Sequence, residues 1–268
     1  MSKDEKSKKN KISTAIGLDI GGTGIKGGIV DLKKGKLVGD RYRIDTPKPS
    51  TPEAVAEVVA QIVTELGSRE GAPDADAPVG ITFPAIIHEG VALSAANVDK
   101  SWIDTDVDTL FTDALNRPVQ VMNDADAAGL AEVRYGAGEG VAGTVLVITL
   151  GTGIGSALIH DGILVPNLEL GHLEVDGHDA ESRASASARE REDLAWEDYA
   201  VRLQRYFSHV EFLFSPKLFV VGGGISKRSE DFLPRLDLRT PIKPAALKNN
   251  AGIVGGALQA AIHFGLRK

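Results

Sequence analysis

The 268-residue chain contains no cysteine, and only 5% of its residues are aromatic. Disulfide bonds and thiolate-bound metal ions are therefore excluded. Apolar residues nevertheless make up 43% of the chain and charged residues 25%, which is ordinary for a globular protein. The length suits one large domain or two lobes, each with its own core.

Long apolar runs and an overall positive charge are also missing. No run approaches the roughly 20 residues of a membrane helix, and the charged N-terminus lacks the apolar core of a signal peptide. The net charge of −7 argues against general nucleic-acid binding. Residues 183–248 differ from the rest of the chain, because they contain 12 Lys and Arg but only 9 Asp and Glu. This excess of positive charge suits a polyanionic ligand. We expect a cytoplasmic protein without membrane or nucleic-acid partners.

Glycine is abundant, and it gathers in three turns that each follow an apolar, strand-like run. These turns cover residues 21–24, 151–155 and 222–224, and the first two share the sequence Gly-Thr-Gly-Ile. Backbone N–H groups in such turns can converge on a phosphate. The alternative is ordinary hairpins that need glycine for positive φ. The repetition favours phosphate binding.

Charged residues distinguish the first turn from the second. Asp19 ends the first strand, whereas an alignment of the two turns without gaps places Ile148 there in the second copy. A carboxylate beside a phosphate suggests Mg²⁺, held directly or through water, and the alternative is an Asp that caps its own turn. Lys26 is placed to reach a transferred phosphoryl group, with a solvated lysine as the equal alternative.

The first turn also matches the pattern GxGxxG through Gly22, Gly24 and Gly27. This match alone raises the alternative of an NAD-dependent oxidoreductase. The residues that follow read as a strand, whereas a dinucleotide-binding turn must open a helix. We therefore disfavour that alternative.

Two further stretches carry polar side chains suited to a hydroxyl-rich substrate. Asn123 and Asp124 follow a strand at 119–122 and open a helix, where the carboxylate can accept the proton of a substrate hydroxyl. The alternative is that Asn123 or Asp124 merely caps the helix. Glu169, His172 and Glu181 add carboxylates and an imidazole, which suit a ligand whose hydroxyls both donate and accept. A zinc site at His172, His178 and their acidic neighbours is disfavoured, because the spacing fits no tight site and structural zinc prefers cysteine.

Apolar runs and turn residues predict strands at 14–20, 79–83, 144–150, 163–165 and 242–244, a helix that starts at Pro52 with Thr51 as its N-cap, and a helix at 124–135. Residues 167–188 show no clear period. Strands and helices thus alternate in two related blocks. This order predicts a two-lobed α/β protein with central mixed sheets. We expect residues 1–12 to be a disordered tail, residues 13–122 with a C-terminal helix at 250–268 to form a small lobe, and residues 123–249 to form a large lobe.

The motifs DIGGTGIKGG, NDADAAG, LGTGIGS, ELGHLE and VVGGGIS, in this order, resemble the ROK sugar kinases. The resemblance covers about residues 14–261 and is greatest to the polyphosphate glucokinase branch, including polyphosphate/ATP-glucomannokinases. It implies the duplicated actin/hexokinase-type (ribonuclease H-like) fold. It also implies phosphoryl transfer from inorganic polyphosphate and/or ATP to the 6-hydroxyl of glucose, with mannose as a second candidate. A non-catalytic sugar sensor on the same fold is the alternative, and the intact Asp124 and phosphate turns argue against it.

The resemblance and the turns together imply a role for each candidate residue. Asp124 would be the catalytic base, and Asp19 would hold Mg²⁺. The donor-binding residues would be Asp19, Gly21, Gly22, Thr23, Gly24, Lys26, Gly151, Thr152, Gly153, Gly222, Gly223 and Gly224. The sugar-binding residues would be Pro84, Ala85, Asn97, Asn123, Asp124, Glu169, His172 and Glu181.

The chain departs from the family in one segment. Many members carry a cysteine-rich zinc motif after Glu-x-Gly-His, but residues 173–184 contain no cysteine. We therefore expect no zinc and packing alone around His172. Because only about a dozen residues precede the first predicted strand, we expect no DNA-binding domain of the kind that the family's repressors carry. The expected assembly is a monomer or a homodimer.

Overall fold

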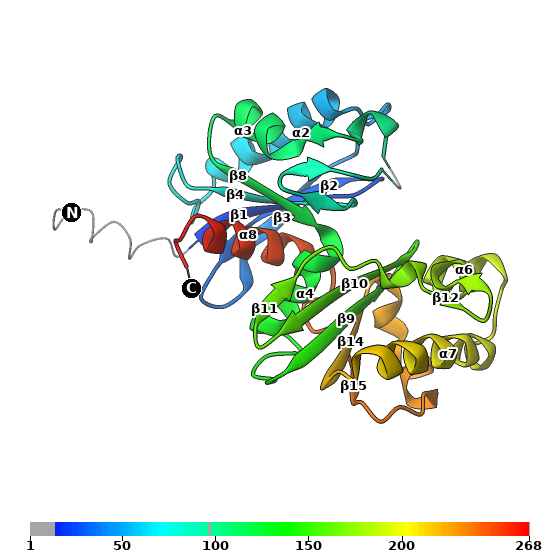
Figure 1. Ribbon diagram of the computed structural model, residues 1–268. Coiled ribbons are helices and arrows are strands. Elements are labelled where there is room, and N and C mark those ends of the chain that lie inside the picture. Colours follow the sequence, from blue (N-terminus) through cyan, green and yellow to red (C-terminus); the bar gives the residue numbers. More distant parts are fainter. Residues whose placement is uncertain (1–13, 96–97, 268) are drawn as a thin grey trace. The chain divides into compact units, whose positions relative to one another are not determined.

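The computed structural model describes residues 14–95 and 98–267 (Figure 1). The expected tail at 1–12 and the candidate Asn97 lie outside these residues. The chain divides into unit 1, Met1–Ala127 with Gly252–Lys268, and unit 2, residues 128–251. The divisions lie within one helix and at the start of another, slightly beyond the expected positions 122 and 249. Among the described residues, no helix has the length and apolarity needed to cross a membrane.

Unit 1 is built on a five-stranded mixed sheet with the order β3-β2-β1-β4-β8. β1, β2 and β3 form an antiparallel meander, and β4 and β8 run parallel to β1. The strands are β1 (Thr14–Ile20), β2 (Ile25–Asp31), β3 (Lys36–Ile44), β4 (Val79–Phe83) and β8 (Val119–Asn123). Because β2 begins directly after the first glycine turn, that turn joins two strands and does not open a helix. The dinucleotide-binding interpretation is therefore wrong.

Helices cover both faces of this sheet (Figure 1). α2 (Pro52–Gly67) and α3 (Val107–Leu115) lie on one face, and α8 (Ala251–His263) lies on the other. α2 begins as expected, with the Thr51 side chain accepting a hydrogen bond from the Ala54 N–H. Gly80 is needed for the close approach of α8, because a Cβ there would lie 1.8 Å from the Gly256 carbonyl oxygen.

A small sheet and an aromatic cluster complete unit 1. The sheet joins β5 (Ile87–His88), β6 (Val91–Ala92) and β7 (Thr105–Asp106). A short 3₁₀ helix, η1 (Lys100–Trp102), carries the fully buried Trp102 ring, which packs between Phe83 and Phe111.

Unit 2 repeats the topology of unit 1, with the order β11-β10-β9-β14-β15. β9, β10 and β11 are antiparallel, and β14 and β15 run parallel to β9. The strands are β9 (Thr144–Leu150), β10 (Ile154–His160), β11 (Ile163–Val165), β14 (Leu218–Gly222) and β15 (Ile242–Pro244). The repeated order confirms the duplicated α/β fold with central mixed sheets.

The sheet of unit 2 also has a helix on each face. α4 (Asp124–Tyr135), whose first turn belongs to unit 1, packs through Gly129 against Ala157. α7 (Trp196–Phe214) covers the opposite face, where its apolar side buries Leu146 and Ile148. The other short elements are η2 (Leu170–His172), β12 (Glu174–Val175), β13 (His178–Asp179), α5 (Ala180–Ala184), α6 (Ala186–Arg191), η3 (Gly224–Asp231), η4 (Leu233–Arg235) and η5 (Lys248–Asn250).

One buried carboxylate on α4 forms hydrogen bonds with the segment after β15. Glu132 is only 1% exposed. Its two oxygens accept hydrogen bonds from the N–H groups of Ala137, Ala246 and Leu247, at 2.9, 3.0 and 2.7 Å. A buried carboxylate needs such partners to offset its lost hydration. Glu132 therefore holds two segments that are far apart in the sequence.

Candidate active site

The candidate residues of unit 1 gather at the carboxyl edge of its sheet. Because β1, β4 and β8 are parallel, their carboxyl ends meet at one edge, where ligands of α/β sheets commonly bind. Asp19 lies opposite Thr82, and Phe83 lies opposite Asn123. The structure thus brings together the first glycine turn, Asp19, Pro84, Ala85, Asn123 and Asp124.

The first glycine turn presents backbone donors to solvent. Gly21 and Gly24 exchange backbone hydrogen bonds. The Thr46 hydroxyl donates to the Gly21 carbonyl, and the Arg43 guanidinium donates to the Thr23 carbonyl. Gly22 and Thr23 are exposed residues, and within the described part of the chain their N–H groups have no hydrogen-bond partner. A turn whose carbonyls are occupied and whose N–H groups are available suits an anion.

Asp19 lies at the centre of a row of polar side chains. Its Oδ2 is 3.4 Å from the Lys26 Nζ, and its Oδ1 accepts a hydrogen bond of 3.2 Å from the Thr82 hydroxyl. Lys26 and Thr82 lie directly opposite Asp19 on the two neighbouring strands. Lys26 is therefore an ion-pair partner of Asp19, a role that sequence reasoning did not foresee.

The counterpart of Asp19 in unit 2 is Thr149, so the alignment without gaps is wrong at this position. Asp19 pairs with Lys26, and in the second copy Thr149 pairs with Gly155, while Ile148 pairs with Ser156. The shift arises because four residues join β1 to β2 but only three join β9 to β10. A hydroxyl thus stands where the first copy has a carboxylate.

Asn123 and Asp124 have different tasks at the start of α4. The Asn123 side-chain oxygen accepts hydrogen bonds from the N–H groups of Ala125 and Asp126, and its amide donates to the Ala85 carbonyl. Asn123 therefore caps the helix, as one interpretation of the sequence held. Asp124 is exposed, and its Oδ1 accepts a hydrogen bond from the Ala125 N–H at 2.8 Å. Its carboxylate is oriented and accessible to a substrate hydroxyl.

In unit 2 the second and third glycine turns lie side by side. Gly223 has φ +82° and ψ 177°, a conformation that only glycine adopts readily. A Cβ at Gly223 would lie 2.2 Å from the Leu150 carbonyl oxygen, directly before the second turn. Glycine at this position therefore allows residues 151–153 and 222–224 to adjoin.

The segment that carries Glu169 and His172 is held against β10. A Cβ at Gly171 would lie 2.3 Å from the Ile154 carbonyl oxygen, so this contact requires glycine. The buried Ser156 hydroxyl donates to the Leu168 carbonyl at 2.7 Å and accepts from the Leu170 N–H at 3.0 Å. These contacts explain the glycine of Glu-Leu-Gly-His and fix the backbone that carries Glu169 and His172.

Glu181, one of the candidate sugar-binding residues, also contacts the second glycine turn. Its Oε2 accepts a hydrogen bond of 3.1 Å from the Ile154 N–H, and a Cβ at Gly153 would lie 2.3 Å from the same oxygen. Sequence reasoning placed Glu181 among the sugar ligands only. The structure also puts its carboxylate against the second turn.

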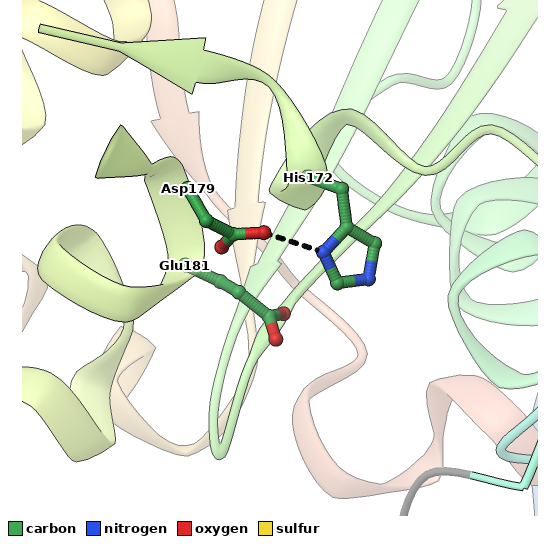
Figure 2. Close-up of side chains that lie close together, drawn as sticks. All are labelled: His172, Asp179 and Glu181. Carbon is green, nitrogen blue, oxygen red and sulfur yellow. Dashed lines mark hydrogen bonds and ion pairs between the residues drawn. The ribbon is translucent and has the colours of Figure 1, made fainter. Parts of the chain in front are cut away.

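His172 is positioned by Asp179, a residue that the sequence did not single out. Figure 2 shows the imidazole of His172 facing the carboxylates of Asp179 and Glu181. Its Nδ1 is 2.8 Å from Asp179 Oδ2, so a hydrogen bond, and not packing alone, orients the ring. Ligand atoms of the three residues lie within 4.8 Å of one another, close enough to bind one metal ion. The expected absence of zinc, which rests on the missing cysteines, stays a prediction.

The charge state of this cluster follows from its contacts. The hydrogen bond with Asp179 raises the pKa of His172, and nearby Glu181 and Glu169 act in the same direction against desolvation. Desolvation raises the pKa of the Glu169 carboxyl, while His172 lowers it and Glu181 raises it. The protonated imidazole is thus favoured beside acidic neighbours.

Replacement of Asp179 by Asn is expected to lower the pKa of His172 towards the usual value of about 6.5. The raised pKa means that the contact stabilises the fold fully below about pH 6.5 and loses that contribution as the pH rises through the folded-state pKa. NMR titration of the imidazole signals with a chelator present would measure the change. An unaltered His172 titration in Asp179→Asn, with Asp161→Asn as control, would contradict this assignment.

Comparison with known proteins places the chain in a family. The model of the ROK family matches residues 15–186. A polyphosphate glucokinase of Mycobacterium tuberculosis (strain CDC 1551 / Oshkosh) is 50% identical over 244 residues, which cover 91% of this chain and 89% of that relative.

Two solved structures share the fold. The crystal structure of inorganic polyphosphate/ATP-glucomannokinase from Arthrobacter sp. strain KM matches with a TM-score of 0.89 and 70% identity, covering 94% of this chain and 99% of that one. A ROK family glucokinase from Streptomyces griseus, in complex with glucose and AMPPNP, matches with a TM-score of 0.76 and 26% identity, covering 91% and 98%. Since the family model spans well over half of the sequence and these matches span nearly all of it, the chain belongs to the ROK family.

Proposed function

We propose that the chain is a hexose kinase that transfers a phosphoryl group from inorganic polyphosphate and/or ATP to the 6-hydroxyl of glucose, with mannose as a second candidate sugar. The observation that carries this proposal is the carboxyl edge of the unit 1 sheet, where the first glycine turn follows β1 and the exposed Asp124 carboxylate follows β8. The names of the two relatives with 50% and 70% identity, a polyphosphate glucokinase and a polyphosphate/ATP-glucomannokinase, support this substrate class.

In the proposed reaction, the sugar hydroxyl oxygen attacks the terminal phosphorus of the donor. The bond to the bridging oxygen breaks, and the donor leaves shortened by one phosphate. Asp124 accepts the proton of the attacking hydroxyl. The N–H groups of the glycine turns orient and neutralise the phosphates, which is most of what phosphoryl transfer requires of a protein. Glu169, His172 and Glu181 are assigned to binding of the sugar hydroxyls. The cytoplasmic location expected from the sequence stays a prediction.

The surroundings of Asp19 fit a magnesium ion. Mg²⁺ commonly takes one or two carboxylates and fills its other positions with water and substrate phosphates. Asp19 offers one partly exposed carboxylate, with the Thr82 hydroxyl beside it and Lys26 as an exchangeable counter-ion. When bound, the ion would neutralise charge on the donor phosphates.

A coupled assay for glucose 6-phosphate tests the proposed function. We expect product when purified protein, glucose and MgCl₂ are combined with either polyphosphate or ATP. Replacing glucose by mannose, with the sugar phosphate measured by mass spectrometry, would establish whether the second sugar is accepted. Absence of phosphorylated sugar with both donors and both sugars would refute the kinase assignment.

Replacement of Asp19 by Ala is expected to lower activity strongly and to raise the Mg²⁺ concentration needed for half-maximal rate. The reason is that the ion loses its protein carboxylate and would be held by substrate and water alone. Asp40→Ala, which removes an exposed carboxylate of β3, is the control. A magnesium titration that is the same in both variants would count against Asp19 as the magnesium ligand.

A further inference from the structure

Arg43 stands beside the first glycine turn, although neither the motifs nor the family resemblance assigned it a role. It lies near the end of β3, directly opposite Lys26, which in turn lies opposite Asp19. Side chains opposite one another on neighbouring strands share a face of the sheet and lie close together. Asp19, Lys26 and Arg43 therefore form one row across the edge that carries the turn.

The guanidinium of Arg43 rests on the turn itself. A Cβ at Gly24 would lie 2.5 Å from the Arg43 Nε and 2.6 Å from its Nη2, so the guanidinium fills the space that a side chain at position 24 would occupy. Its Nη2 also donates a hydrogen bond of 3.0 Å to the Thr23 carbonyl. These contacts hold the positively charged guanidinium next to the available N–H groups of Gly22 and Thr23.

The existing partner of Arg43 can be exchanged for a phosphate. Its Nη1 is 2.7 Å from Asp45 Oδ1, and the two side chains are 50% and 81% exposed. Exposed ion pairs of this kind contribute little to stability. A guanidinium presents several donors in one plane and binds phosphate oxygens through paired hydrogen bonds.

The basic stretch at 183–248 offers fewer available charges than its composition suggested. Six of its arginines form ion pairs with neighbouring acids, namely Arg191, Arg202, Arg205, Arg228, Arg235 and Arg239. Arg189 instead lies over the Trp196 ring. The count of positive residues there therefore does not correspond to an equal number of free phosphate-binding groups.

We propose that Arg43 binds a phosphate of the donor at the first glycine turn and favours a phosphate chain over a nucleotide. The proposal rests on the proposed kinase function. The base and ribose of a nucleotide fix where its phosphates lie, whereas a phosphate chain without a nucleoside can place any of its phosphates on the guanidinium. Loss of Arg43 therefore weakens the binding of polyphosphate more than the binding of ATP.

Steady-state kinetics of Arg43→Gln, Arg43→Lys and the control Arg41→Gln would test this role. We expect Arg43→Gln to raise the KM for polyphosphate by about tenfold or more, since a hydrogen bond to a charged group is lost. The KM for ATP should rise less than about threefold, because the base and ribose, and not Arg43, position its phosphates. The KM for glucose should not change, because the sugar contacts remain. Arg43→Lys, which keeps the charge without the planar fork, should lie between the wild type and Arg43→Gln.

Calorimetric titration of the same proteins with tripolyphosphate separates this inference from the kinase function, because it requires no turnover. Weaker binding by Arg43→Gln than by Arg41→Gln, with equal melting temperatures, would support the assignment even if no sugar were phosphorylated. Equal tripolyphosphate binding in the two variants would overturn it. Equal losses for ATP and polyphosphate in the kinetic assay would overturn the preference for a phosphate chain.

Discussion

Asp124→Asn is expected to lower kcat for sugar phosphorylation by about 10²–10⁴-fold, the usual contribution of a positioned general base. Asparagine has nearly the same shape and keeps an acceptor for the Ala125 N–H that Asp124 now binds. It cannot take up the proton of the attacking hydroxyl. Glucose affinity should therefore change little, and the loss should appear in kcat and not in KM.

The control for this experiment is Asp113→Asn, which removes an exposed carboxylate from another helix of unit 1. Its kcat should equal that of the wild type. Glucose binding by both variants can be followed by calorimetry without turnover. Near-normal kcat in Asp124→Asn would remove Asp124 from the role of base, whereas lost glucose binding would make it a sugar ligand first.

Glu132→Ala is expected to reduce the free energy of unfolding by roughly 3–6 kcal/mol, because three N–H groups lose a charged acceptor. Such a loss is a large part of the 5–15 kcal/mol that stabilises most domains. It should be visible as a lower melting temperature and a lower midpoint in urea. Glu132→Gln should also destabilise the protein, since its amide group would turn a donor towards one of these N–H groups.

The matched control is Glu139→Ala, which removes an exposed glutamate shortly after α4. Its melting temperature should stay within about 1–2 °C of the wild type, as for most surface substitutions. If Glu132→Ala melted like Glu139→Ala, the hydrogen bonds of Glu132 would not contribute to stability as the geometry indicates.

Much of the fold could be predicted from local patterns. β1, β4, β9, β11, β15 and α4 have the bounds expected from the sequence, and α2 starts at Pro52 after its Thr51 cap. The bounds of these elements can be predicted from the sequence because side-chain periodicity and helix capping depend on only a few neighbouring residues. Residues 167–188 showed no period, and the structure explains this, since they contain only short elements.

Candidate site residues were predictable where a local motif indicates their role. They were not predictable where the role depends on a contact with a residue distant in the sequence. The three glycine turns and the exposed Asp124 were found directly from strand ends and turn residues. Asp179, Ser156 and Arg43 were missed as supporting residues, because each acts through a contact that no spacing rule encodes. Lys26 was noticed, but its ion pair with Asp19 depends on the register between β1 and β2.

By itself the sequence determined the repeated strand–turn–strand plan, the glycine turns and the residue types available for chemistry, since these depend on local steric and polar preferences. Only the tertiary structure decided that Thr149 is the counterpart of Asp19, that Glu181 lies against the second turn and that Arg43 fills the space beside Gly24. The physical reason is that strand register and packing across a sheet bring together residues whose separation along the chain carries no such information.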